Sequence, residues 1–205
     1  MTTEAEPPRL TRSETKEQTH GLLLDAAERV FVKMGYAGAT MDLIAAAAGF
    51  TKGAVYWHFD SKEALFLELL GRGLKRNADD AARVLSVMAD HPARVDEVMG
   101  EWFDRFDTMS NVPLLGLEMD MASRRNPALA EALEQVVLRQ RAAVCQLLDN
   151  YFHLVDRDPA MPMEELASSM MALSKAVALA RQTSHSTQLT SARAVRILLG
   201  MPNRM

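Results

Sequence analysis

The sequence predicts an all-α fold, and three observations lead to this prediction. Apolar residues recur three and four positions apart along almost the whole chain, which is the spacing of one face of a helix. No segment alternates apolar and polar residues over the length of a strand, and no Asn-Gly or Asp-Gly pair marks a hairpin. Hydrophobic residues make up 48% and charged residues 24% of the 205 positions, which is typical of a packed globular chain rather than a disordered one.

The amino-terminal region is expected to begin with a flexible arm over residues 1–14. A first helix is predicted from about Thr15 to Met34, with its apolar residues on one stripe. Gly35 is expected to end this helix, because glycine accepts the left-handed conformation just past a helix terminus.

Three helix N-caps then follow one another closely, at Thr40, Thr51 and Asp60. The threonine hydroxyls and the aspartate carboxylate can each accept a hydrogen bond from a free N–H of the first turn. Glu63 completes a capping box with Asp60, and Gly49 ends the first of the three helices. These helices are predicted at Met41–Ala48, at Lys52 to about Phe59, and from Ser61 to beyond Lys75.

The rest of the chain is predicted to form longer helices. Breaks are expected at Asn111–Pro113 and in the turn-rich stretch Asp156–Pro162. The predicted helices begin near Ala93 after Pro92, and then span about Leu114–Arg125, Asn126–Leu154, Met163–Gln182 and Ser191–Leu199. We therefore divide the chain into the arm, a domain over residues 15–62 and a larger domain over residues 63–205.

The segment Thr40–Lys62 is the most informative part of the chain. Two short helices separated by a tight turn through Gly49 form a helix-turn-helix, whose second helix can enter the major groove of DNA. The N–H groups at the capped helix N-termini can bind phosphate oxygens. Lys52 lies in the first turn of the second helix, where a cation is mildly unfavourable for the helix itself. Its presence is easier to explain if it faces a nucleic acid.

The residues that follow Lys52 also suit a groove. Gly53 and Ala54 are small enough for the backbone to approach DNA, and Ala54 can touch only apolar base surface such as a thymine methyl. Tyr56, Trp57 and His58 each offer apolar area and one donor. Residues 9–76 carry ten Lys or Arg against eight Asp or Glu, whereas the remainder is acidic and the whole chain has a net charge of -4. This asymmetry favours anion contact in the front part.

A set of spaced residues resembles the tetracycline-repressor-like (TetR) family of bacterial transcriptional regulators over roughly residues 15–70. The resemblance is carried by Gly35-Tyr36, Thr40, Ile44-Ala45, Ala48-Gly49, Thr51-Lys52-Gly53, Tyr56-Trp57-His58-Phe59 and Ser61-Lys62-Glu63. It implies an amino-terminal three-helix bundle with the helix-turn-helix and a larger helical domain for ligand binding and dimerisation. It also implies a homodimeric repressor that binds a palindromic DNA operator and leaves it when a small-molecule effector binds.

The resemblance assigns roles to residues of the helix-turn-helix. Phosphate contacts are implied for Thr40, Thr51, Tyr56, His58 and Lys62, and base contacts for Lys52, Gly53, Ala54 and Trp57. Arg9 and Arg12 are expected in the arm, where they can reach an adjacent groove. Phe50 stands where an aliphatic residue is usual and Ala54 where a hydroxyl residue is common, which leaves the operator sequence open. Tyr56, His58 and Lys62 also have simpler interpretations, as core or surface residues, and Phe59 is interpreted as core.

An effector pocket is expected in the larger domain. Nine of the fourteen methionines fall between Met88 and Met171, and methionine lines pockets for varied apolar ligands, although it also fills cores. Following the family layout, the candidate wall is Trp102, Phe103, Phe106, Met109, Leu117, Met121 and Tyr151. Glu118 and Asp120 are interpreted as part of a solvated helix face.

The last two predicted helices are apolar enough to leave an uncovered face. In the larger of them, Ala167, Met171, Ser174 and Ala178 form a stripe of mostly small residues. The resemblance favours pairing of these helices with their copies in a homodimer, whereas the residues alone allow them to cover a monomer core.

The sequence gives no support for catalysis, a metal or a cofactor. The five histidines lack the spacing of a metal site, and no Ser-His-Asp order or phosphate-binding glycine loop is present. The single cysteine, Cys145, allows no internal disulfide. No apolar run approaches the ~20 residues of a membrane span and the first twenty residues lack a signal peptide core, so a cytoplasmic protein without a membrane partner is expected.

Two other functions stay open on the sequence. One is a helical ligand carrier or small enzyme with no specific DNA binding. The other is a DNA-binding protein whose larger domain dimerises but senses no ligand.

Overall fold

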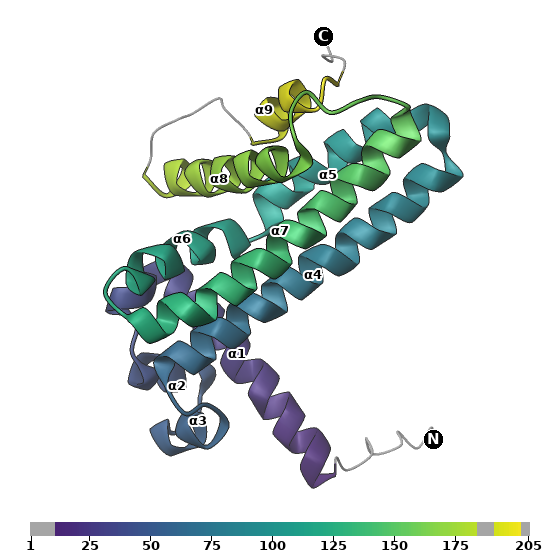
Figure 1. The fold of residues 1–205 in the computed structure, drawn as a ribbon. Helices are drawn as coiled ribbons and strands as arrows, with labels where there is room; N and C mark the ends of the chain where they lie inside the picture. Colours follow the sequence, from purple (N-terminus) through teal and green to yellow (C-terminus); the bar gives the residue numbers. More distant parts are fainter. Residues whose placement is uncertain (1–10, 184–190, 202–205) are drawn as a thin grey trace, which may run out of the picture. The chain divides into compact units, whose positions relative to one another are not determined.

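The computed structural model describes residues 11–183 and 191–201, and these fold into helices without a strand (Figure 1). This confirms the all-α prediction. The elements are α1 (Arg12–Gly38), α2 (Met41–Ala48), α3 (Lys52–His58), α4 (Lys62–Asp90), the 3-10 turn η1 (Pro92–Arg94), α5 (Val95–Met109), α6 (Val112–Ser123), α7 (Pro127–Val155), α8 (Met163–Gln182) and α9 (Ser191–Leu198).

The chain divides into two compact units, Met1–Leu69 and Leu70–Met205, which we call the amino-terminal and carboxy-terminal units. The division falls inside α4, whereas the sequence placed a boundary at residues 62 and 63, near the start of that helix. Among the described residues, no helix combines the length and apolar character needed to cross a bilayer.

Helix α1 begins three residues earlier than predicted, because Thr11 forms a capping box. The Thr11 hydroxyl accepts a hydrogen bond from the Glu14 N–H at 3.2 Å, and the Glu14 carboxylate accepts one from the Thr11 N–H at 2.7 Å. Arg12 is therefore the first helical residue, and our expectation that it lies in a flexible arm was wrong. Arg9 lies outside the described residues.

The two threonine caps of the helix-turn-helix are confirmed. Thr40 accepts from the Leu43 N–H, and Thr51 accepts from the Ala54 N–H, both at 3.2 Å. Gly49 ends α2 in the left-handed conformation, with φ 74° and ψ 22°. A residue with a Cβ is strained in this conformation, so glycine is what allows so short a turn between α2 and α3.

Two other predicted helix ends differ in detail. The cap of α4 is Ser61 rather than Asp60, because the Ser61 hydroxyl accepts the Ala64 N–H at 3.1 Å. At Gly35, where φ is 68° and ψ is 170°, α1 leaves helical geometry as expected, but helical hydrogen bonding resumes and the helix ends at Gly38. Residues with side chains rarely adopt such a φ, which explains glycine at this kink.

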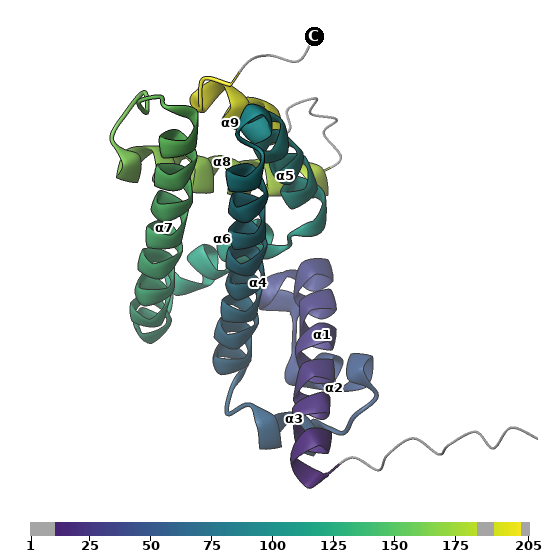
Figure 2. The ribbon, with the colours of Figure 1, turned by 90° about the vertical axis from the view of Figure 1, so that its right-hand side faces the viewer.

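The amino-terminal unit is held together by apolar contacts from all its helices. Figure 2 shows α2 and α3 beside α1. Phe31 of α1 meets Phe66 of α4 edge to face, with ring centroids 4.5 Å apart. Val55 of α3 and Phe59 directly after it are buried, which confirms the core interpretation of Phe59. These two residues fix which side of α3 faces inward.

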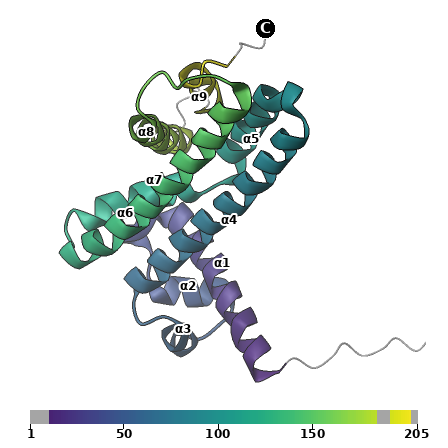
Figure 3. The ribbon, with the colours of Figure 1, turned by 45° about the vertical axis from the view of Figure 1, so that its right-hand side comes forward.

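The helices of the carboxy-terminal unit surround one apolar core. Helix α7 packs on α6 and α8, and α9 packs on both α5 and α8. Figure 3 shows α8 nearly end-on while α7 runs across the view, so these two helices cross steeply. A Cβ at Gly100 of α5 would collide with the guanidinium of Arg196 in α9, so glycine permits this close approach.

The small-residue stripe of α8 does not lie where we expected it. Ala167 is fully buried, and Met171 and Ser174 line a cavity described below. Ala167 therefore cannot belong to an uncovered face of α8, whereas the pairing of α8 and α9 with their copies stays a prediction. The exposed positions of α8 instead include Ala176 and Leu179.

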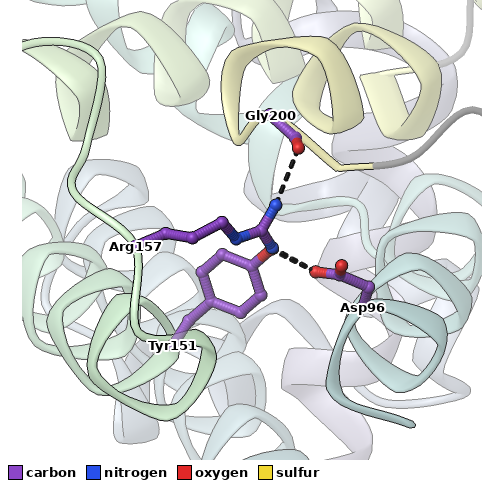
Figure 4. A network of polar contacts seen from close by, with 4 residues as sticks. All are labelled: Asp96, Tyr151, Arg157 and Gly200. Carbon is purple, nitrogen blue, oxygen red and sulfur yellow. Dashed lines mark hydrogen bonds and ion pairs between the residues drawn. The ribbon is translucent and has the colours of Figure 1, made fainter. Parts of the chain in front are cut away.

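A polar network joins α5, α7, the loop after α7 and the end of α9 (Figure 4). The Tyr151 hydroxyl donates to the Asp96 carboxylate at 2.5 Å, and Arg157 donates to the same oxygen at 2.5 Å. Arg157 also donates to the Gly200 carbonyl at 2.7 Å. Tyr151 is fully buried, and burial, followed by the hydrogen bond to Asp96, raises the pKa of its hydroxyl.

This network predicts a measurable contribution of one hydroxyl group to stability. In Tyr151→Phe, the Asp96 carboxylate and Arg157 lose a buried partner, so we expect the free energy of unfolding to fall by about 1–2 kcal/mol in urea titrations. Tyr56→Phe is the matched control because Tyr56 is exposed. Equal effects of the two substitutions would contradict the role of the network.

Candidate functional site

Helix α3 presents a polar and aromatic face to solvent. Lys52, Gly53, Tyr56 and Trp57 are exposed, and the Trp57 side chain is 62% accessible, while Val55 points into the core. Large aromatic rings left in solvent on a short helix indicate a surface for another molecule. The structure thus brings these four predicted DNA-binding residues onto one accessible helix.

The other predicted residues around α3 lie close by. Thr40 and Thr51 are exposed, and their hydroxyl oxygens accept the capping hydrogen bonds. A capping hydroxyl keeps its own O–H as a donor, so both threonines can still bind a phosphate oxygen. Ala54 is partly buried and lines a groove with residues of α1.

Lys52 has a local partner that the sequence analysis did not consider. Its ammonium donates to the Asp42 carboxylate of α2 at 3.0 Å, and this hydrogen bond raises the pKa of Lys52. Both side chains are more than half exposed, so the pair contributes little to stability and is weakened by salt. The ammonium can therefore exchange Asp42 for a phosphate or a base.

The groove between α1 and α3 was missed by the sequence analysis. It has a volume of about 490 Å³ and is lined on the α1 side by Arg12, Thr15, Lys16 and Thr19. The Lys16 ammonium lies 4.7 Å from the centroid of the Trp57 ring. The three- and four-residue spacing of these donors on α1 is a signal that could have found them.

His58 lines this groove and is partly buried, unlike the exposed Tyr56 and Trp57. Its Nδ1 is 3.3 Å from Nδ1 of His20, whose other ring nitrogen contacts the Glu68 carboxylate. Partial burial lowers the pKa of His58, His20 and Lys16 lower it further, and Glu68 opposes this shift. The imidazole of His58 therefore takes up a proton less readily in the folded unit than in the unfolded chain.

Lys62 makes contacts within the amino-terminal unit. Its ammonium donates to the Tyr36 carbonyl at 2.9 Å and the Ala39 carbonyl at 3.1 Å, and lies 4.3 Å from the Tyr36 ring centroid. The Tyr36 hydroxyl in turn donates to Glu63, and this hydrogen bond lowers the pKa of that carboxyl. Lys62 thus holds the end of α1 against α4, and its predicted phosphate contact is untested.

The carboxy-terminal unit contains a cavity of about 360 Å³ with mostly apolar walls. Trp102, Phe103 and Phe106 of the predicted wall line it. Other helices contribute wall residues that were not predicted from the sequence, which include Leu74, Ala78, Val112, Val136, Val144, Leu147, Met170 and Met171. The Trp102 indole N–H donates to Asp80 at 2.7 Å, so the ring is fixed at the wall.

The remaining predicted pocket residues lie elsewhere. Met109 and Met121 are 78% and 58% exposed, Leu117 is partly buried, and none of the three lines the cavity. Tyr151 does not line the cavity either, and its hydroxyl forms a hydrogen bond with Asp96 in the network of Figure 4. Asp120, interpreted from the sequence as solvated, accepts a hydrogen bond at 2.5 Å from Lys175 of α8.

The model of the family described as "Bacterial regulatory proteins, tetR family" matches residues 23–69, which cover most of α1, the whole of α2 and α3, and the start of α4. This chain belongs to the TetR family. The resemblance found in the sequence is confirmed, and the helix-turn-helix of this TetR-family protein lies inside the matched segment.

Two curated relatives extend the similarity beyond this segment. The transcriptional activator FasR of Mycolicibacterium smegmatis is 30% identical over 146 residues, which are 71% of this chain and 63% of FasR. The transcriptional repressor BepR of Brucella suis is 27% identical over 165 residues, which are 80% of this chain and 66% of BepR. The match spans less than two thirds of either relative.

Solved structures share the fold of this TetR-family protein at low sequence identity. The regulator FadR of Bacillus subtilis, solved in complex with stearoyl-CoA, superimposes with a TM-score of 0.62 at 14% identity. The match covers 88% of this chain and 96% of that one. FadR of Bacillus halodurans gives a TM-score of 0.68 at 20% identity, covering 90% of this chain and 100% of that one. At such identities the likeness concerns the fold.

No group of three or more His, Cys, Asp or Glu side chains within residues 11–183 and 191–201 is placed to hold a metal ion.

The environment of His58 predicts a pH dependence for this TetR-family protein. Because folding lowers the pKa of His58, the unfolded chain binds more protons than the folded one as the pH falls below 6.5. We expect the free energy of unfolding of the wild type to decrease over this range, and to decrease less in His58→Gln. Urea titrations at several pH values test this, with His91→Gln at an exposed position as the control. Identical pH profiles for wild type and His58→Gln would contradict the assignment.

Proposed function

We propose that this protein is a ligand-responsive DNA-binding transcriptional regulator that acts in the cytoplasm, most simply as a repressor. The observation that carries the proposal is the exposed face of α3, where Lys52, Tyr56 and Trp57 are accessible on a helix of a helix-turn-helix. The names of the relatives support a role in transcription and not in catalysis. They include both an activator and a repressor, so the direction of regulation is part of the proposal.

The proposed contacts divide between phosphates and bases. Phosphate oxygens would bind at Thr40, Thr51, Tyr56 and His58, and base edges would face Lys52, Gly53, Ala54 and Trp57. We add the α1 residues Arg12, Thr15 and Lys16, because they lie along the same groove as Trp57 and His58. We leave Lys62 out, since two backbone carbonyls already hold its ammonium.

A homodimer is part of the proposal because one recognition helix is short. Helix α3 has seven residues and reads few base pairs, whereas two copies related by a two-fold axis read a palindrome with half-sites about one helical turn apart. The carboxy-terminal unit offers exposed apolar side chains for such an interface, including Leu179 of α8 and Ile197 of α9. We propose these exposed positions instead of the stripe of small residues on α8, because Ala167 of that stripe is buried.

The cavity of the carboxy-terminal unit is the proposed effector site. Its volume and mostly apolar lining are those of a small-molecule pocket, and the related FadR fold was solved with an acyl-CoA. We expect the effector to bind more tightly to the dimer conformation whose recognition helices do not fit the operator. Its binding would then shift the population toward that conformation and away from DNA. The difference between the effector's affinities for the two conformations supplies the free energy that couples effector binding to DNA release.

Selection from a random pool of DNA duplexes at low ionic strength tests the proposal. We expect the purified protein to retain a palindromic sequence, and occupation of the cavity to release it. Ligand binding without retention of any duplex would contradict the proposal and favour a helical ligand carrier or small enzyme. If the protein retains DNA and no ligand of the cavity releases it, the result would favour a DNA-binding protein whose larger domain dimerises but senses no ligand.

Lys52 gives a sharper test of the interface. We expect Lys52→Gln to weaken binding to a selected duplex and to reduce the slope of log affinity against log salt, because a cation that faces the bases in the groove also releases counterions from the duplex. Lys33→Gln is the matched control, since Lys33 is exposed near the other end of α1. Both affinities are measured by fluorescence anisotropy at several salt concentrations. Equal slopes for the two variants would remove Lys52 from the interface.

A further inference from the structure

The polar groups of the cavity are biased toward positive charge. Lys75 of α4, Arg139 of α7 and Lys175 of α8 belong to its lining, and among the described residues no Asp or Glu does. Most of the remaining wall is apolar and aromatic, with Trp102, Phe103 and Phe106 among its residues. The cavity therefore combines an apolar interior with cations from three helices.

Two of the three cations already have carboxylate partners. The Lys75 ammonium lies 3.0 Å from the Asp79 carboxylate one turn along α4. The Lys175 ammonium lies 2.5 Å from the Asp120 carboxylate, which belongs to α6. These pairs cancel much of the charge of both lysines, so neither is the first group to attract a ligand.

Arg139 differs from the two lysines, since it makes no hydrogen bond or ion pair with another described residue. It both lines the cavity and is exposed, so its side chain is accessible from the cavity and from solvent. The neighbouring wall positions on the same helix are the apolar residues Val136, Ala143 and Val144 and the polar, uncharged Gln140. A ligand with its tail among these residues would bring its head group to Arg139.

We infer that the effector of this cavity is an amphipathic anion, a single apolar tail that ends in a carboxylate or phosphate held by Arg139. A planar guanidinium donates two parallel hydrogen bonds to either group. The tail replaces water along the apolar and aromatic wall. A cationic head group of the same size would instead meet the positive guanidinium of Arg139. The inference rests on the proposed function only in taking this cavity as the effector site.

Binding of matched probes to the DNA-free, full-length protein tests this inference. Dodecanoate and dodecyl phosphate share one tail with dodecanol and dodecyltrimethylammonium, so differences in affinity report the head group. We expect both anions to bind about tenfold more tightly than the cation, which corresponds to about 1.4 kcal/mol. Octanoate should bind more weakly than dodecanoate, by up to about fourfold for each methylene removed from the cavity.

Substitution of Arg139 separates the contribution of the ligand's head group to the binding affinity from the contribution of its tail. We expect Arg139→Gln to weaken dodecanoate binding five- to tenfold and to leave dodecanol binding unchanged. Arg141→Gln is the matched control, because Arg141 lies on the same helix outside the cavity lining. Isothermal titration calorimetry gives the affinities. In a Trp57→Phe background, fluorescence reports Trp102 alone, because the chain has two tryptophans.

Three results would overturn the inference. They are equal or tighter binding of dodecyltrimethylammonium, an unchanged dodecanoate affinity in Arg139→Gln, and failure of dodecanoate and dodecyl phosphate to bind at all. None of these measurements involves DNA, so each would leave the proposed regulator in place. If dodecanoate instead binds as expected but releases no selected duplex at saturation, the ligand assignment stands and the proposed effector response fails.

Discussion

The docking of α3 through Val55 and Phe59 is the constraint on which the rest of the account depends. A helix of seven residues is not stable in water by itself, because its nucleation cost is offset by too few hydrogen bonds. Burial of these two side chains, together with the Thr51 cap and the left-handed turn at Gly49, holds it in place. The same contacts decide which side of α3 faces outward, and so they leave Trp57 in solvent. The proposed recognition of DNA by α3 would in this sense be a consequence of how the core is filled.

In the carboxy-terminal unit, incomplete packing of the core creates the candidate binding site. Its long helices bury large side chains such as Met88 and Tyr151, yet around Trp102 they do not close completely and leave a cavity. Cations from three of these helices line that cavity, and Arg139 is the one without a carboxylate partner among the described residues. A ligand can therefore gain both apolar contact and charge neutralisation there. The position of α6 against α8 is tied to the same wall through the pair of Asp120 with Lys175.

Much of the fold followed from local rules, and much of the site did not. The caps at Thr40 and Thr51 and the turn at Gly49 depend on neighbouring residues only, so the sequence was sufficient to predict them. The pocket wall depends on which helix faces which, and apolar spacing could not distinguish exposed Met109 from a lining residue. Apolar spacing also could not show that the Tyr151 hydroxyl forms hydrogen bonds with Asp96 and Arg157, because these partners come from α5 and the loop after α7.

The most direct test of the central claim uses the two tryptophans, since one lies in each unit. Two-dimensional NMR of isotope-labelled indole N–H groups follows Trp57 and Trp102 separately while a selected duplex is added. Because Trp57 is exposed on α3 and Trp102 donates to Asp80 inside the other unit, the account predicts a large shift of the Trp57 signal at stoichiometric duplex, clearly greater than that of Trp102. An unmoved Trp57 signal in a protein that has bound the duplex would contradict the claim that α3 contacts DNA.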